Sequence, residues 1–320
     1  SVHQSILSNP TKALSRLVSS NLFKDTKFDA LQSQIAESYF YSNKLDEAYK
    51  LSVISSERSG NEIPLASWTA GLSAWKQGKY LEAAKHFERT ANSPRASAWM
   101  AAAGAHWAAR SYLRGHQPQN VSFWLHKAAE HPRSFYGIIS AKALGMEQSR
   151  FNWDMPQLNA KLIRSLANLK SGKRALALMD AKRPDFAEQE LRQINPGDDK
   201  TLQEAMMALA HAAGVPAFEM RLGSGLQDPN GNLYDGALYP DAPWEPKGGY
   251  EVDKALVYAF IRQESKFDAA VSNKDSGAMG LMQLMPSTAR NIAGKAGLKV
   301  DMARLQDPTV NLALGQKYLA

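Results

Sequence analysis

The chain has 320 residues, 44% hydrophobic and 22% charged, which is enough for two domains with cores of their own. A formal net charge of +7 favours acidic partners, but the cations are scattered and no nucleic-acid motif is present. The absence of cysteine excludes disulfides, thiolate metal sites and cysteine nucleophiles, and no apolar stretch approaches the roughly 20 residues of a membrane span.

Residues 1–222 are predicted to be α-helical almost throughout, with Pro and Gly at intervals between the helices. Segments 35–55 and 70–91 share one pattern, in which an aromatic residue precedes a short polar turn and an alanine-containing helix. Small and large residues that alternate in this way let paired helices pack closely. We therefore predict helical repeats in residues 1–222, without assigning a repeat family.

Residues 223–249 differ in composition, because they are rich in Gly, Pro, Asp and Asn. Such a composition is typical of a linker. We predict that this linker connects the helical domain at 1–222 to a second domain at 250–320. Tyr239 and Trp244 are expected to lie against that second domain, since a polar tether would not need them.

Residues 255–261 form an apolar run with helical spacing, which ends at Arg262. Glu264 lies three and four positions after Ile261 and Phe260, so we expect it to share their face and to point inward or into a cleft. Partial desolvation and the negative end of the helix dipole would both favour its protonated form, which suits a proton donor. The alternative is a helix-terminal glutamate that pairs with a neighbouring cation in solvent.

A loop of small residues, 277–280, follows this helix, and the next five residues lead into Pro286, which suits the first turn of another helix. Glycines let a backbone approach a ligand closely, Gln283 offers a donor and an acceptor, and Met282 and Met285 offer adaptable apolar surface. This inventory suits a neutral ligand rich in hydroxyl and amide groups, such as an amino sugar. The alternative is an ordinary glycine-containing turn with core methionines.

The segments IRQESKFD at 261–268 and GAMGLMQLMPSTA at 277–289 together resemble the catalytic core of the soluble lytic murein transglycosylases. The resemblance implies an all-α chain in which a superhelical domain precedes a lysozyme-like domain. It also implies that Glu264 is the single catalytic acid and base. The residues that it places along the sugar-binding groove are Ser265, Gly280, Leu281, Met282, Gln283 and Met285.

The implied reaction is cleavage of the β-1,4 bond between N-acetylmuramic acid and N-acetylglucosamine in peptidoglycan, with a 1,6-anhydromuramyl product and no cofactor or metal. A glycosidase of the usual kind needs two carboxylates. The acids close downstream of Glu264 are Asp268 and Asp275, and neither has an apolar context that would fix it opposite Glu264. A hydrolase like the goose-type lysozymes stays an alternative within the enzyme class.

The chain's last predicted helix runs from Pro308, with Asp307 as its N-cap, and the sequence given stops at Ala320. The family's catalytic domain normally continues further, so we expect residues 250–320 to be a truncated lysozyme-like domain. Two hypotheses follow: an enzyme whose superhelix holds the glycan or a protein partner, or a scaffold that grips peptidoglycan without cutting it.

Both hypotheses make peptidoglycan glycan strands the expected partner, and neither involves nucleic acid or a membrane span. The expected location is the periplasm. The start SVHQSILSNP lacks a basic region followed by an apolar one, so we expect any secretion signal to be removed or never present.

Overall fold

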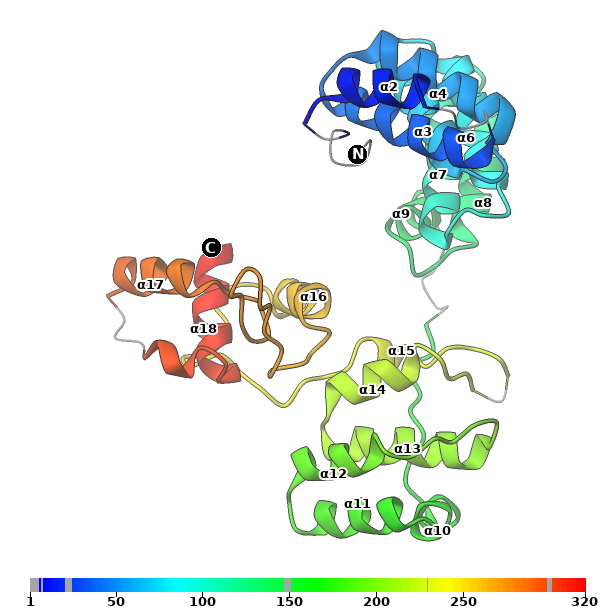
Figure 1. Ribbon diagram of the computed structural model, residues 1–320. Coiled ribbons are helices and arrows are strands. Elements are labelled where there is room, and N and C mark those ends of the chain that lie inside the picture. The colour runs from blue at the N-terminus through cyan, green and yellow to red at the C-terminus, as the bar shows by residue number, and fades with distance from the viewer. Residues whose placement is uncertain (1–5, 7, 21–24, 147–150, 229, 298–300) are drawn as a thin grey trace. The chain divides into compact units, whose positions relative to one another are not determined.

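The computed structural model describes residues 6, 8–20, 25–146, 151–228, 230–297 and 301–320. Every regular element in these ranges is an α-helix or a 3-10 helix, and strand-like pairing is limited to isolated bridges. The all-α prediction is therefore confirmed. Internal contacts divide the chain into two units, Ser1–Arg150 and Phe151–Ala320, which are described separately (Figure 1).

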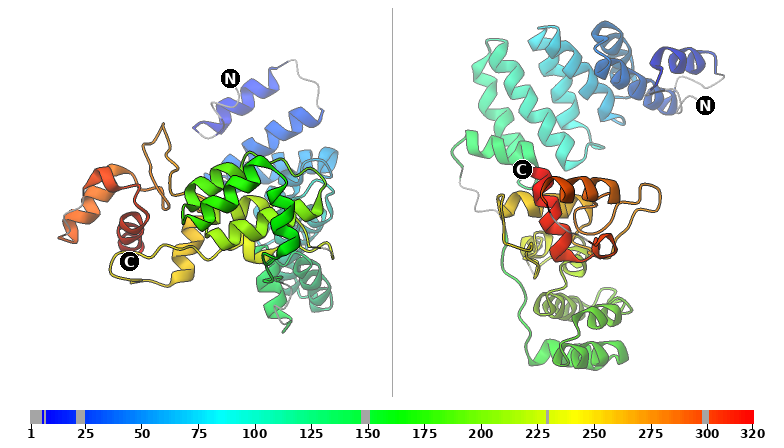
Figure 2. Two further views of the ribbon diagram at one scale, coloured as in Figure 1. Left: turned by 90° about the horizontal axis from the view of Figure 1, so that it is seen from below. Right: turned by 90° about the vertical axis from the view of Figure 1, so that its left-hand side faces the viewer.

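The first unit is a stack of helical hairpins. Its elements are Pro10–Val18 (α2), Thr26–Tyr41 (α3), Leu45–Ser59 (α4), Pro64–Lys76 (α5), Tyr80–Asn92 (α6), Ala98–Arg114 (α7), the 3-10 turn Pro118–Asn120, Val121–Ala129 (α8) and Phe135–Ala143 (α9). Each α-helix packs on the next along the chain, and α3, α5, α7 and α9 also contact one another in turn (Figure 2). This is the neighbour pattern of a helical solenoid, as the two related hairpin segments predict.

Small residues set the close spacing of these helices. A Cβ on Gly71 of α5 would lie 2.6 Å from the ring of Phe87 in α6, and a Cβ on Gly104 of α7 would lie 2.7 Å from the backbone nitrogen of Ala91. Phe87 is fully buried in the same cluster as the alanines of α7. A large residue on one helix thus fills the space that glycine or alanine leaves on the next.

The second unit begins with five helices: Ala160–Ala167 (α10), Lys170–Asp180 (α11), Pro184–Leu191 (α12), Lys200–Ala213 (α13) and Pro216–Gly223 (α14). Leu166, Leu191 and Leu209 are among the buried residues of their core. Helix α14 belongs to two cores, because Phe218 packs into this one while Met220 packs against the C-terminal core. It therefore joins the helical stack to the region that carries the predicted site.

The segment predicted as a linker, 223–249, contains the short helix Asp235–Leu238 (α15), in which Ala237 and Leu238 are buried. Trp244 packs against the C-terminal core, as expected, and Tyr239 is 38% exposed with its ring against Arg262 of α16. The domain boundaries at residues 222 and 249 stay predictions.

The last elements are Lys254–Glu264 (α16), Pro286–Lys295 (α17), the 3-10 turn Met302–Arg304 and Pro308–Leu319 (α18), and Figure 1 shows the three α-helices grouped together. Asp307 caps α18 as predicted, because its carboxylate accepts hydrogen bonds from the backbone of Thr309 and Val310. Ile261, Leu281, Leu305 and Leu312 are among the buried residues that hold these helices together. None of the helices in the described ranges has the length and apolar character that crossing a membrane would need.

Candidate active site

The helix that carries Glu264 buries only a narrow stripe. In α16, Val257 and Ile261 have no exposed surface, whereas Leu256 and Phe260 are 45% and 37% exposed. The apolar run therefore predicts the helix correctly, but two of its large side chains, Leu256 and Phe260, lie on the outer surface of the described structure. Phe260, which the sequence places with the core, belongs to this outer face.

The chain turns sharply directly after Glu264. Lys266 and Phe267 both adopt left-handed backbone conformations, with φ of 52° and 64°. This turn directs Phe267 into the core, where it is 1% exposed and packs edge-on against Tyr258 with ring centroids 5.8 Å apart. Two consecutive non-glycine residues in this conformation are uncommon and mark a turn that the surrounding core must hold in place.

This turn leaves Glu264 exposed at the last position of α16. Of the two orientations expected for Glu264, the inward one is therefore wrong for the described residues, and the one into a cleft stays a prediction. The helical spacing places it near the buried face, but it lies beyond the packed part of the helix, and Phe267 fills the core below. The desolvation expected around this carboxylate is not supplied by the described part of the chain.

Ser265 is 7% exposed and donates a hydrogen bond from Oγ to the carbonyl oxygen of Ile261 at 3.0 Å. The same carbonyl also accepts from the backbone N–H of Ser265. Ser265 thus ends the helix and fixes the direction in which the chain leaves it, a role that its place in the sequence did not predict.

The predicted loop forms a compact unit in which backbone segments pair antiparallel. Ser272 and Leu284 both form isolated bridges with Met279. Gly280 has φ of 73° and donates its N–H to the carbonyl oxygen of Val271 at 3.0 Å. The six residues 280–285 thus include five predicted groove residues, which the backbone hydrogen bonds of this loop hold close together.

The side chains of these five residues have different surroundings. Leu281 and Met282 are buried in the core that α16 and α18 share, so they support the loop from below. Gln283 has φ of 44° and donates from Nε2 to the carbonyl oxygens of Gly280 at 2.9 Å and Val271 at 3.2 Å. Its donors therefore hold the loop. Met285 is 44% exposed at the N-cap of α17 and is available to a ligand.

The sequence analysis missed Asn311, which orders the loop from α18. Its Oδ1 accepts a hydrogen bond from the backbone N–H of Met282, and its Nδ2 donates to the carbonyl oxygens of Met279 and Leu305. Asn311 has no exposed surface. The sequence does contain one sign of this role, because a polar residue stands between Val310 and Leu312 on a predicted core helix.

Two further residues attach α16 to the segment before it. Arg262 donates from Nε to the carbonyl oxygen of Leu238 at 3.0 Å. The hydroxyl of Tyr258 donates to Asp241 and accepts from the backbone N–H of Ala242, both at 3.1 Å. Burial raises the pKa of this tyrosine well above its ordinary value, so the hydroxyl stays protonated and keeps its donor.

The other nearby acids serve local structure. The carboxylate of Asp268 accepts a hydrogen bond from the backbone N–H of Ala270 at 2.9 Å. Asp275 lies exposed in a turn where its backbone N–H donates to the side chain of Asn273. Among the described residues, no group of three or more His, Cys, Asp or Glu side chains could hold a metal ion.

Two cavities lie in the same unit as the predicted site. One, of about 360 Å³, is lined by Ser265, Lys266 and Asp268, by Arg192, which directly follows α12, and by residues of α14 that include Arg221. Its three cations suit carboxylate groups of a ligand.

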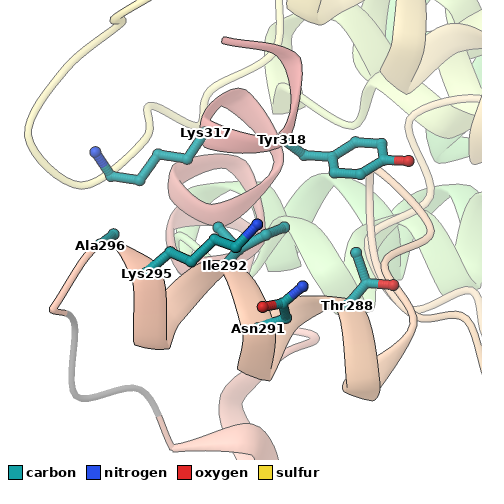
Figure 3. A pocket seen from close by; sticks show the side chains of 7 residues that line it. All are labelled: Thr288, Asn291, Ile292, Lys295, Ala296, Lys317 and Tyr318. Atoms are coloured by element: carbon teal, nitrogen blue, oxygen red, sulfur yellow. The ribbon is translucent and has the colours of Figure 1, made fainter.

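The other cavity, of about 410 Å³, lies between α17 and α18. Figure 3 shows Thr288, Asn291 and Lys295 of α17 facing Lys317 and Tyr318 of α18. None of these five residues was among those expected at the site.

Known proteins similar to this chain share both its fold and its C-terminal motifs. Residues 243–320 match the transglycosylase SLT domain. The chain is 32% identical over 102 residues to the endo-type membrane-bound lytic murein transglycosylase A of two Klebsiella pneumoniae strains, which covers 26% of this chain and 50% of each relative.

Solved structures resemble nearly the whole chain. An inactive mutant of the lytic transglycosylase Slt from Pseudomonas aeruginosa superposes with a TM-score of 0.75 at 22% identity, covering 99% of this chain and 51% of that one. The 70-kDa soluble lytic transglycosylase in complex with bulgecin A gives 0.71 at 20% identity, and the Escherichia coli enzyme SLT70 gives 0.71 at 19%.

The chain spans about half the length of the relatives and solved structures that it matches. The superposition extends over both units and confirms the predicted fold, a helical superhelix followed by a lysozyme-like region. Residues 243–320 match the transglycosylase SLT domain, within a chain that has the fold of the soluble lytic transglycosylases.

Proposed function

We propose that the protein is a lytic transglycosylase that cleaves the β-1,4 bond between N-acetylmuramic acid and N-acetylglucosamine in peptidoglycan. The observation that carries the proposal is the combination of an SLT-domain match at 243–320 with one core that joins the end of α16 to the loop 277–285. Glu264 ends α16, so this arrangement attaches the predicted acid to the predicted sugar-binding loop.

In the proposed reaction Glu264 is first an acid and then a base. It donates its proton to the glycosidic oxygen as the bond to C1 of the muramyl residue breaks, and N-acetylglucosamine leaves with a free hydroxyl group. The carboxylate then takes the proton of the muramyl C6 hydroxyl as that oxygen closes on C1. The product is a 1,6-anhydromuramyl end, Glu264 regains its proton, and no water is consumed.

The roles of Asp268 and Asp275 support a site with one carboxylate. Asp268 caps a local turn and Asp275 lies in an exposed one, so neither is held as the second carboxylate that an ordinary glycosidase requires. An internal hydroxyl of the substrate supplies the nucleophile instead. The groove residues that we propose are Ser265, Gly280, Leu281, Met282, Gln283 and Met285, with Met285 the most accessible side chain among them.

The decisive experiment replaces Glu264 by Gln, which keeps the size of the side chain and removes its titrating proton. Purified sacculi are incubated with the natural protein, with Glu264→Gln and with Glu245→Gln, an exposed glutamate of the same unit. Mass spectrometry should show anhydromuropeptides with the natural protein and with Glu245→Gln, and none with Glu264→Gln. Release at the parent rate by Glu264→Gln would refute the assignment, and products one water heavier would identify a hydrolase.

A second candidate function is that of a scaffold that binds peptidoglycan without cleaving it. The exposure of Glu264 favours it, because the described residues do not desolvate the carboxylate. Sedimentation with sacculi, without any soluble product, would be its result. Either function requires contact with the cell wall, so we also propose a periplasmic location. A protein partner for the superhelix stays a prediction.

A further inference from the structure

We propose that the second unit carries a separate glycan-binding site, formed by the exposed rings of Trp153 and Tyr239 and the polar groups around them. These two residues, with Phe151, are called the aromatic platform. Its ligand would be a neutral chain of N-acetylated hexosamines. That such a glycan would come from peptidoglycan rests on the proposed function, whereas the binding site itself does not.

The platform exposes aromatic surface to solvent. Trp153 is 58% exposed and Tyr239 is 38% exposed. The rings of Phe151 and Trp153 are stacked at 5.6 Å with an angle of 24° between their planes, and Trp153 lies 6.3 Å from Tyr239. A cluster of three rings at the surface costs free energy in water unless a ligand covers it.

The platform borders a cavity of about 590 Å³, which is in the range of small-molecule sites. Besides Trp153 and Tyr239, it is lined by Asp154, Met155, Gln157, His211, Gly236 and Asp241. Aromatic faces bind the apolar faces of sugar rings, while carboxylate and amide oxygens accept hydrogen bonds from hydroxyl and N-acetyl groups. The described lining contains two acidic residues and neither lysine nor arginine, which disfavours an anionic peptide or a nucleic acid.

His211 is held in one orientation at the edge of this cavity. Its Nδ1 lies 3.0 Å from Oε1 of Glu219, whose side chain is buried. Since Nδ1 is engaged with the carboxylate, the second ring nitrogen is the one that can serve as a polar contact for a ligand.

The platform is built on a braced backbone, so little ordering is needed when a ligand binds. Asn152 and Asp235 exchange two hydrogen bonds: the backbone N–H of Asn152 donates to Oδ2 of Asp235 at 2.7 Å, and the N–H of Asp235 donates to the carbonyl oxygen of Asn152 at 2.8 Å. A Cβ on Gly236 would lie 2.9 Å from Met155. The chain at 152–155 is therefore closely fitted to α15.

The platform is also attached to the helix that ends at Glu264. The guanidinium group of Arg262 lies 4.7 Å from the centre of the Tyr239 ring. Its Nε also donates to the carbonyl oxygen of Leu238. A glycan bound on the platform would thus be held in the same compact unit as the proposed catalytic acid, so the platform can retain a strand between cleavage events.

The test observes Trp153 directly, in protein labelled with fluorotryptophan and carrying Glu264→Gln so that no ligand is cleaved. Fluorine NMR resolves the tryptophans, and Trp153→Phe identifies the resonance of Trp153. We expect this resonance to shift and saturate as the β-1,4-linked tetrasaccharide of N-acetylglucosamine is added. Tyr239→Ala should weaken that titration by about tenfold, since a contacting ring is lost.

Three controls make the result specific. Tyr239→Phe keeps the ring and should titrate like the parent, whereas Tyr41→Ala removes an exposed tyrosine of the first unit and should change nothing. The proposal is overturned if the Trp153 resonance does not move at millimolar tetrasaccharide, or if it moves equally in Tyr239→Ala. It is also overturned if a free stem peptide shifts the resonance and the tetrasaccharide does not. Because Glu264→Gln is present throughout, a failure of the proposed catalytic role leaves this titration unaffected.

Discussion

Asn311 accepts a hydrogen bond from the backbone N–H of Met282 at 2.8 Å, across 29 positions of sequence. The same amide donates to Met279 at 3.0 Å and to Leu305 at 2.8 Å, and it has no contact with solvent. One side chain of α18 therefore fixes the backbone of the predicted sugar-binding loop on both sides of Gly280. The proposed groove depends on this contact for its shape.

Asn311→Ala should lower the free energy of unfolding of the second unit by about 3 kcal/mol, because the buried N–H of Met282 and the carbonyl oxygen of Leu305 lose their partner and the carbonyl oxygen of Met279 loses one of its two donors. Denaturant unfolding measures the loss. Asn291→Ala, at an exposed position of α17, should stay within about 0.5 kcal/mol of the parent. Equal effects of the two changes would show that the Asn311 contacts do not hold the loop.

Gly280 and Gly277 form a natural matched pair, because both have a left-handed backbone, with φ of 73° and 74°. A Cβ at Gly280 would lie 2.5 Å from Nδ2 of Asn311, whereas a Cβ at Gly277 would meet nothing within 4 Å. Gly277→Ala should therefore cost about 1 kcal/mol for the backbone conformation alone.

Gly280→Ala should cost about 2 kcal/mol more than Gly277→Ala, since the added methyl group also displaces the Asn311 amide. The comparison of the two unfolding free energies isolates this packing effect. If the two variants are equally stable, Asn311 has room to move and the loop is less constrained than its contacts indicate.

How far the sequence predicted the site is clearest at Glu264 and Asn311. The apolar spacing of 255–261 placed a helix that ends at Glu264, and the glycines at 277 and 280 placed the loop correctly. The spacing could not show that the chain turns through Lys266 and Phe267, because a left-handed conformation at non-glycine residues is imposed by tertiary packing. The contact of Asn311 with Met282 is set by a distant part of the chain, so no local pattern contains it.

Gln283 offers a test of the proposed function at the loop itself. Gln283→Glu removes the two hydrogen bonds that Nε2 donates to Gly280 and Val271. A carboxylate at this position repels both carbonyl oxygens, so the loop should shift. We expect the rate of anhydromuropeptide release to fall by about ten- to a hundredfold, the scale of loss when positioning groups move by about an ångström. Gln189→Glu, at an exposed position of α12, is the control and should keep the parent rate.

The first unit contains an ion pair with a buried carboxylate, and this carboxylate should dominate the unit's sensitivity to mutation. Asp29 of α3 is completely buried and accepts hydrogen bonds from Arg58 and, at 2.7 Å, from the hydroxyl of Ser59. Asp29→Ala should lower the unfolding free energy by about 3 to 5 kcal/mol, because Arg58 loses its partner and a cavity opens. The pair Arg95 and Glu62 is exposed, so Glu62→Ala should cost less than about 1 kcal/mol. Similar losses of unfolding free energy in Asp29→Ala and Glu62→Ala would contradict a structural role for the pair of Asp29 and Arg58.

Two histidines of the first unit should make its stability depend on pH. Burial lowers the pKa of His86 and of His106 from the ordinary 6.5 to about 4, and the nearby cations Arg89 and Arg110 add to the respective effects. His106 also contacts the hydroxyl of Ser140 and the ring of Tyr136, which carry no charge near neutral pH, while Glu82 opposes the effect at His86.

Because the pKa values of both histidines are lower in the folded chain, the unfolded chain binds more protons than the folded chain at pH values between about 4 and 6.5. The stabilising effect is complete above pH 6.5 and is lost as the pH falls toward 4. Each histidine is partly solvated, so we expect a loss on the order of 1 kcal/mol per residue over this range.

Urea unfolding at a series of pH values tests this expectation. The parent should lose stability across the range, and the double variant His86→Gln/His106→Gln should have a flatter profile. Carboxylates titrate at the acid end in both proteins, so the difference between the two profiles isolates the histidines. His126→Gln, at an exposed position of α8, should follow the parent. Coincident profiles for the parent and the double variant would mean that these histidines are protonated as readily in the folded chain as in the unfolded one.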